Sequence, residues 1–111
     1  TLLVTAAIFD NLPAAQALKQ AGADMNLMPS PLKGTALHWA LTGRNLELAA
    51  ALADLGVDPR IGQRLGSVTL NAAEQYCRFL SGRLIGPERQ ASFERMARAF
   101  EKWGLKMPCG F

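Results

Sequence analysis

A short pattern recurs in this chain at a spacing of 34 residues. Residues 21–24 (Ala-Gly-Ala-Asp) correspond to residues 55–58 (Leu-Gly-Val-Asp), and Leu3 corresponds to Leu37 at the same distance. A fixed period of this size is typical of folds that stack copies of one small unit, because a single unit cannot bury its apolar face alone. The recurrence therefore indicates a repeat architecture.

Composition is compatible with one globular domain. The chain has 111 residues, of which 50% are hydrophobic and 19% charged, which excludes a disordered segment. No apolar run approaches the roughly 18 residues of a membrane span, so we expect no membrane insertion. The apolar start, residues 1–9, lacks a basic leader and an initiator Met, and we interpret it as a mature or excised N-terminus close to a repeat boundary.

The stretch from Gly34 to Pro59 carries the pattern most fully: GTALHWALTGRNLELAAALADLGVDP. It opens with Thr35-Ala36-Leu37-His38, continues through two short apolar helical patterns and closes on Gly56-Val57-Asp58. Over this whole unit the sequence resembles an ankyrin repeat. The resemblance implies an all-α, ankyrin-type helix-turn-helix solenoid with hairpin-like loops and a modified C-terminal capping helix pair.

The resemblance divides the single domain, residues 1–111, into three units and a tail. These are repeat one (1–33), repeat two (34–66), a modified capping repeat (67–104) and the tail (105–111). The helices expected in the first two units span residues 2–9, 13–21, 36–42 and 46–55. In the third unit a helical pattern begins near Val68 and runs on through Leu80, followed by a turn over 81–88 and a last helix over 88–103 with a polar outer face.

Several turn residues have predicted roles. Asn11 is placed to cap the second helix, and Gly22 and Gly56 to take the left-handed conformation that ends a helix. The family has Gly where Arg44 falls, so we expect the left-handed residue to shift to Gly43. Asp24 and Asp58 recur once per repeat, which favours backbone hydrogen bonding in turns over acid–base catalysis.

No set of residues indicates catalysis. His38 is the only histidine, and the sequence places neither a nucleophile nor a metal-binding set beside it. Phosphate-binding Gly-rich motifs are also missing from the sequence. By resemblance, Thr35, Leu37 and His38 belong to the structural repeat motif, with Thr35 and His38 hydrogen-bonded to each other and to neighbouring turns. We expect no catalytic residue, cofactor, metal or small-molecule substrate.

The resemblance implies a surface that binds another protein, formed by the hairpin loops and the exposed side of the first helices. The positions that map to this surface and that we predict to bind a partner are Phe9, Met28, Lys33, Arg44, Arg60, Arg64, Gln75 and Tyr76. The predicted function is non-catalytic protein–protein interaction, inhibitor-like or scaffolding. The alternative is a regulatory or targeting segment of a larger enzyme whose catalytic part lies outside this chain.

Charge is unevenly distributed along the chain. Residues 1–59 carry three basic and five acidic side chains (−2), and residues 60–111 carry nine basic and four acidic ones (+5). The positive half is compatible with an acidic partner surface, but we favour ordinary solvated helices, because +5 spread over two helices is a weak electrostatic signal. Nucleic-acid binding is not expected, because Phe79 between Arg78 and Arg83 fits a helical core stripe better.

The two cysteines, Cys77 and Cys109, fit no zinc pattern. We favour two unpaired thiols. The alternative is a disulfide that pins the tail onto the third unit, which would imply an oxidising compartment, periplasmic or extracellular. The sequence does not establish a localisation; with unpaired thiols the cytoplasm is slightly favoured.

Overall fold

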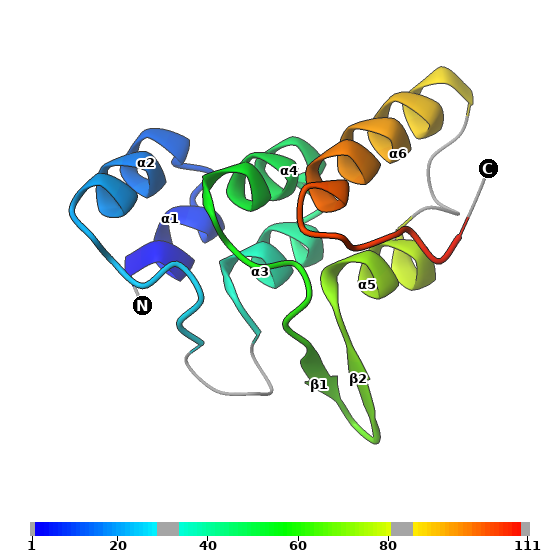
Figure 1. The fold of residues 1–111 in the computed structure, drawn as a ribbon, viewed down its shortest axis with the longest axis horizontal. Helices are drawn as coiled ribbons and strands as arrows, with labels where there is room; N and C mark the ends of the chain where they lie inside the picture. Colours follow the sequence, from blue (N-terminus) through cyan, green and yellow to red (C-terminus); the bar gives the residue numbers. More distant parts are fainter. Residues whose placement is uncertain (1, 29–33, 81–85, 110–111) are drawn as a thin grey trace.

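The computed structural model describes residues 2–28, 34–80 and 86–109, and these are mostly helical with one small antiparallel sheet (Figure 1). The elements in chain order are α1 (Leu2–Ile8), α2 (Leu12–Gln20), α3 (Ala36–Thr42), α4 (Leu46–Leu55), β1 (Gln63–Leu65), β2 (Val68–Leu70), α5 (Ala72–Phe79) and α6 (Gly86–Glu101). Among these, no helix is long and apolar enough to cross a membrane.

The helices lie in two rows. Helices α1, α3 and α5 pack side by side in one row, α2, α4 and α6 lie in the other, and the β1–β2 hairpin projects away from both (Figure 1). The bounds predicted for α3 and α4 are confirmed, and those of α1 and α2 are correct to within one residue.

Asparagine caps begin both second-row helices of the first two units. The Oδ1 of Asn11 accepts a hydrogen bond from the N–H of Ala14 (3.1 Å), and the Oδ1 of Asn45 accepts one from the N–H of Leu48 (3.1 Å). The predicted cap at Asn11 is confirmed, and its counterpart lies 34 residues on.

Left-handed residues end the helices at the same period. Gly22 (φ +83°) and Gly56 (φ +117°) adopt the predicted conformation. Gly43 does not: its φ is −77°, and Arg44 takes the left-handed position itself at φ +59°. The expectation for Gly43 is therefore wrong. Asp10 is the equivalent residue of the first unit, with φ +52°.

The third unit differs from the prediction at its start. Residues 68–70, expected to open a helix, instead form β2, which pairs with β1 across a two-residue turn at Gly66 and Ser67. Helix α5 begins after Asn71, whose side chain accepts from the N–H of Glu74 while the Glu74 carboxylate accepts from the N–H of Asn71. This capping box sets the start of α5. Helix α6 spans 86–101 instead of 88–103. Of the turn predicted over 81–88, residues 81–85 lie outside the described residues, and residues 86–88 belong to α6.

The core lies between the two rows and is rich in alanine and leucine. Leu37, Leu41 and Leu52 are fully buried. Helix α6 packs against α4 and adds the buried Met96 and Phe100 to the core. Small residues such as those of α4 allow neighbouring helices to approach closely.

Ion pairs tie the outer side of α6 to α4. Asp54 accepts from Arg95 (2.8 Å) and from Lys102 (3.0 Å), and Arg95 also approaches Glu47 (3.4 Å). Burial by itself raises the pKa of Asp54, but the hydrogen bonds and charges of Arg95 and Lys102 outweigh it. The pKa of Asp54 therefore lies below its ordinary value.

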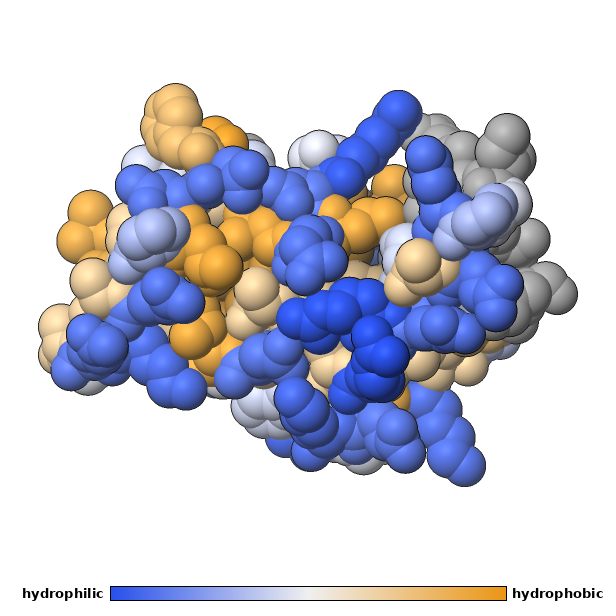
Figure 2. All heavy atoms as spheres, turned by 90° about the horizontal axis from the view of Figure 1, so that it is seen from above, coloured by the Kyte–Doolittle hydropathy of each residue, from blue (hydrophilic) through white to orange (hydrophobic). Residues whose placement is uncertain are grey.

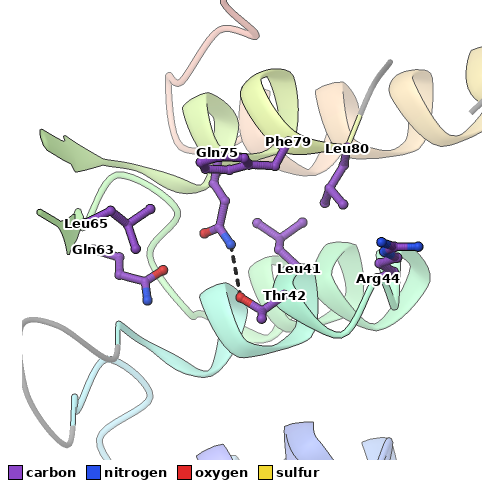
Figure 3. A pocket seen from close by; sticks show the side chains of 8 residues that line it. All are labelled: Leu41, Thr42, Arg44, Gln63, Leu65, Gln75, Phe79 and Leu80. Atoms are coloured by element: carbon purple, nitrogen blue, oxygen red, sulfur yellow. Dashed lines mark hydrogen bonds between the residues drawn. The ribbon is translucent and has the colours of Figure 1, made fainter. Parts of the chain in front are cut away.

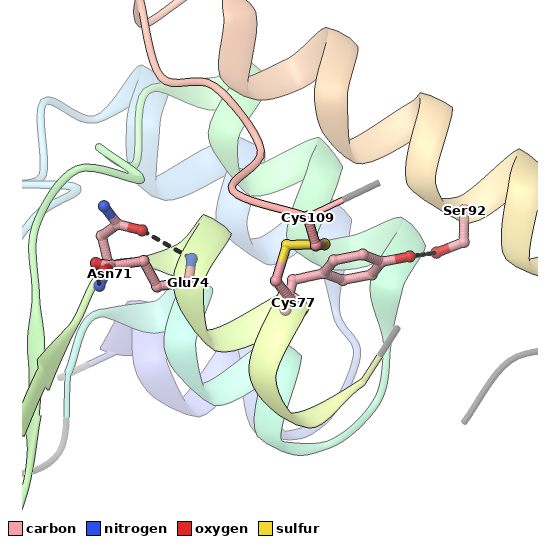
Figure 4. The surroundings of a disulfide bond; sticks show 6 residues. Asn71, Glu74, Cys77, Ser92 and Cys109 are labelled. Atoms are coloured by element: carbon pink, nitrogen blue, oxygen red, sulfur yellow. Dashed lines mark hydrogen bonds between the residues drawn. A yellow bond between two sulfur atoms is a disulfide. The ribbon is translucent and has the colours of Figure 1, made fainter. Parts of the chain in front are cut away.

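A disulfide joins Cys77 of α5 to Cys109 of the tail, with the two Cα atoms 5.6 Å apart (Figure 4). The preferred prediction of two unpaired thiols is wrong, and the alternative is correct. Beside the bridge, Tyr76 reaches α6, where its hydroxyl lies 3.2 Å from the Oγ of Ser92. The bridge and this contact attach the C-terminal part of the chain to α5.

Candidate partner-binding surface

A hollow of about 360 Å³ lies between α3, α5 and the hairpin (Figure 3). Its lining combines apolar and polar side chains from all three elements: Leu41, Thr42, Arg44, Gln63, Leu65, Gln75, Phe79 and Leu80. Arg44 lies at one end, and Gln63 and Leu65 of β1 lie at the other. Leu65 and Phe79 are 37% and 42% exposed, so their apolar surface is open to a ligand.

The polar floor of the hollow is held in place by a buried cluster. Gln75 Nε2 donates to Thr42 Oγ1 (3.2 Å), and Gln75 Oε1 lies 2.6 Å from the Nδ1 of His38. The Nε2 of His38 lies 2.9 Å from the carbonyl oxygen of Ile61, in the connection leading to β1, and a neutral imidazole donates to one of these two oxygens. These bonds join α3, α5 and the connection to the hairpin around one imidazole.

Two predicted partner-binding residues are buried instead of exposed. Gln75 is 5% exposed and Tyr76 is fully buried, so the expectation that these two side chains are exposed is wrong. The physical reason is register. The N-caps Thr35 and Asn71 are 36 residues apart, whereas the prediction assumed 33.

The corrected register identifies residues that the sequence reasoning missed. With a spacing of 36, Thr42 and Gly43 at the end of α3 correspond to Arg78 and Phe79 at the end of α5. Both are exposed, and the Arg78 guanidinium lies over the Phe79 ring at 5.8 Å. The signal was present in the sequence as the capping box Asn71-x-x-Glu74.

The other predicted partner-binding residues are dispersed. Phe9 is 77% exposed at the end of α1, and Arg64 is exposed on β1. Arg60 does not line the hollow: it binds Asp58 (2.8 Å) and lies over the Trp103 ring at 5.4 Å. Met28 is half-buried, and Lys33 lies outside the described residues.

The structural repeat residues mostly have their predicted roles. Asp24 accepts from the N–H of Asn26, and Asp58 from the N–H of Arg60, each at 2.9 Å, as expected for turn residues. The hydrogen bond from the Arg60 guanidinium, which outweighs the effect of burial, lowers the pKa of Asp58, and the Arg60 backbone bond adds to it. The expected Thr35–His38 bond is wrong, since the buried Thr35 hydroxyl has no hydrogen-bond partner within the part of the chain that is described.

A second hollow of about 360 Å³ adjoins the first along the same row, between α1 and α3. It shares Thr42 with the first hollow and is lined further by Ile8, Asp10 and Trp39. The two hollows form a strip that follows the ends of α1, α3 and α5. We call the first the α3–α5 hollow and the second the α1–α3 hollow.

The outer face of α1 and α2 carries a separate, more apolar hollow of about 500 Å³. It is lined by Leu2 (74% exposed), Phe9, Ala14 and Leu18. Figure 2 shows hydrophobic atoms at the end of the molecule where α1 and α2 lie. Of the residues 34 positions later on α3 and α4, Ala36, Leu48 and Leu52 are buried. The face that is covered at these positions of α3 and α4 is thus uncovered on α1 and α2.

Chemically, this surface provides shape, apolar contact and cationic or amide groups. Within residues 2–28, 34–80 and 86–109, no three His, Cys, Asp or Glu side chains gather as a metal site would require. Comparison of the chain with models of known protein families, with curated proteins and with solved structures finds no match. The geometry of the surface itself therefore has to support any functional proposal.

Proposed function

We propose that this chain is an ankyrin-like repeat module that recognises another protein, without catalysis, through the strip along α1, α3 and α5. The observation that supports this most is the pair of adjoining hollows sharing Thr42. They lie on one row of helices and beside the projecting hairpin, so a partner could contact side chains from three successive units at once (Figure 1).

The strip is preorganised by hydrogen bonds within the chain, and this favours a role in recognition. Gln75 and His38 connect α5 to α3, and the Asn26 side chain accepts from the N–H of Asp58 (2.6 Å), connecting the first unit to the second. A surface that needs little ordering loses less entropy on binding. An inhibitor-like or scaffolding role relies on such a surface.

Affinity capture with matched variants tests this proposal. The strip variant is Arg44→Ala/Phe79→Ala, and the control is Gln16→Ala/Arg98→Ala, which changes exposed residues of α2 and α6. We expect a partner that the wild type and the control retain and the strip variant loses, with all three chains equally helical by circular dichroism. A partner that the strip variant retains in full would contradict the proposal.

The uncovered face of α1 and α2 favours a second candidate, a regulatory or targeting segment within a larger protein. An apolar face of this kind is unusual when left in water and is typical of a surface that another element covers. Hydrogen exchange of α1 in the natural polypeptide, compared with the 111-residue chain, tests this. Stronger protection of α1 in the natural polypeptide supports it, and equal protection contradicts it.

The disulfide supports an oxidising compartment, periplasmic or extracellular, in place of the cytoplasm. To test this, the protein is quenched in acid directly from its source and its free thiols are then blocked. We expect Cys77 and Cys109 to be recovered as the disulfide. Recovery of both as blocked thiols would contradict this assignment.

A further inference from the structure

We propose that the α3–α5 hollow binds a short acidic segment of the partner protein, which places one apolar side chain in the hollow and a carboxylate beside Arg44. This inference rests on the proposed function and specifies the chemistry of the partner.

The apolar part of the site accommodates one side chain. Leu41, Leu65 and Leu80 line the hollow, and Phe79 is its half-exposed aromatic wall. Its volume of about 360 Å³ is near the lower end of the range of about 300–1,000 Å³ typical of small-molecule cavities. That suits a leucine- or phenylalanine-sized group better than a folded element. Burying such a side chain contributes about 1.5–3 kcal/mol.

The charged groups around the hollow are basic. None of its eight lining residues is acidic, and Arg44 lies at one end of the hollow (Figure 3). Arg64 is exposed on β1, and Arg78 lies over the Phe79 ring. Neither Arg44, Arg64 nor Arg78 forms an ion pair with a described residue, so their charges remain available to a ligand.

Three carboxylates of α4, α5 and the connection to β1 are engaged elsewhere. Asp54 pairs with Arg95 and Lys102 on the outer side of α6, and Asp58 pairs with Arg60. The Glu74 carboxylate accepts from the N–H of Asn71 at the start of α5. The local charge of the site is therefore positive, although residues 1–59 as a whole carry −2. Complementary charge steers a partner and selects it against basic competitors.

One carboxylate sets the direction of the ligand. Asp10 lines the neighbouring α1–α3 hollow and would repel an acidic residue placed there. We therefore expect the acidic residues of the ligand to lie toward Arg44 and the α5 side, over Arg78. The end of the segment that reaches the α1–α3 hollow would be neutral or apolar.

Selection from a displayed library of random 12-residue peptides on the immobilised, oxidised protein tests the inference. We expect enriched peptides to combine Asp or Glu with Leu, Ile, Phe or Met within a few residues. Synthetic copies should bind about 10-fold or more weakly to Arg44→Glu, and weaken as salt rises. The matched control is Arg98→Glu, which makes the same charge reversal on the exposed side of α6 and should leave affinity unchanged.

Four results would overturn the inference. The first is enrichment of neutral or basic peptides, or none; the second is equal affinity for Arg44→Glu and wild type. The third is displacement of the peptide by a single-stranded oligonucleotide, which would assign the basic groups to nucleic acid. A natural partner that is lost with Arg44→Ala/Phe79→Ala but unaffected by Arg44→Glu would refute the acidic segment and leave the proposed function standing.

Discussion

The Nδ1 of His38 lies 2.6 Å from the Oε1 of Gln75, and this contact joins two residues that are 37 positions apart in the chain. The His38 ring is 1% exposed, and its Nε2 lies 2.9 Å from the Ile61 carbonyl oxygen. Gly34 makes room for it, since a Cβ at that position would come within 2.7 Å of the His38 side chain. The imidazole thus links α3, α5 and the connection that leads to the hairpin.

Gln75→Ala should destabilise the protein by about 1–3 kcal/mol. The substitution leaves the buried Nδ1 of His38 without its partner and removes the bond to Thr42, and an unsatisfied buried polar group costs about that much. Urea denaturation followed by circular dichroism measures the change. Gln16→Ala on the exposed side of α2 is the control and should change stability by less than about 0.5 kcal/mol. Equal midpoints for the two variants would mean that the contact contributes nothing.

Removing the disulfide should lower stability by about 2–4 kcal/mol. Cys77 and Cys109 enclose a loop of 32 residues in sequence separation, and a loop of that size restricts the unfolded chain by about this amount in the chain-entropy model. The double variant Cys77→Ala/Cys109→Ala should denature at a lower urea concentration than the oxidised wild type. Reductant should move the wild type toward the variant and leave the variant unchanged. A wild type insensitive to reductant would show that the bridge does not form in solution.

The sequence was sufficient where the period is regular. Three pairs of residues lie 34 positions apart and have matching roles: Gly22 and Gly56, Asp24 and Asp58, and Asn11 and Asn45. The chemistry of a left-handed residue, a turn carboxylate or a helix cap is local. Local chemistry can be predicted from neighbours in the sequence.

Prediction failed where the spacing departs from the 34-residue period. Tyr76 was assigned to the exposed face because the third unit was aligned from Val68, yet the hairpin turn at Gly66 and the Asn71 cap move the helix start by three residues. Cys77 and Cys109 are 32 residues apart in the chain, so no local sequence pattern indicates that they pair. The α3–α5 hollow depends on packing between three elements, so a list of exposed positions could locate Arg44 but not the space beside it.

The Asp54 ion pairs should make stability depend on pH below neutrality. Because the pKa of Asp54 is lowered in the folded state, its contribution is present above the unfolded value of about 3.9 and is lost as pH falls through the folded value. Asp54→Asn should therefore be less stable than wild type at pH 7, by about 1 kcal/mol or less for so exposed a pair. The difference should disappear near pH 2. Glu101→Gln, an exposed change on α6, is the control and should show no such pH-dependent difference.

Arg44→Gly should stabilise the protein and lower its affinity for the acidic ligand. Arg44 has φ +59°, a conformation that costs a residue with a Cβ about 1–2 kcal/mol, whereas the extra freedom of glycine in the unfolded chain costs about 0.5–1 kcal/mol. The expected net gain is about 0.5–1 kcal/mol by urea denaturation. A natural choice of arginine here, against local backbone preference, is explained if the guanidinium has a task in binding.

Arg44→Ala separates the two effects. It removes the same charge but keeps a Cβ, so it should gain no stability and should lose the selected acidic peptide to the same extent as Arg44→Gly. The two variants would then differ in denaturation midpoint and agree in affinity. If instead both bind the peptide as wild type does, the left-handed arginine is only a turn residue, and the inference that Arg44 holds the carboxylate of the ligand is overturned.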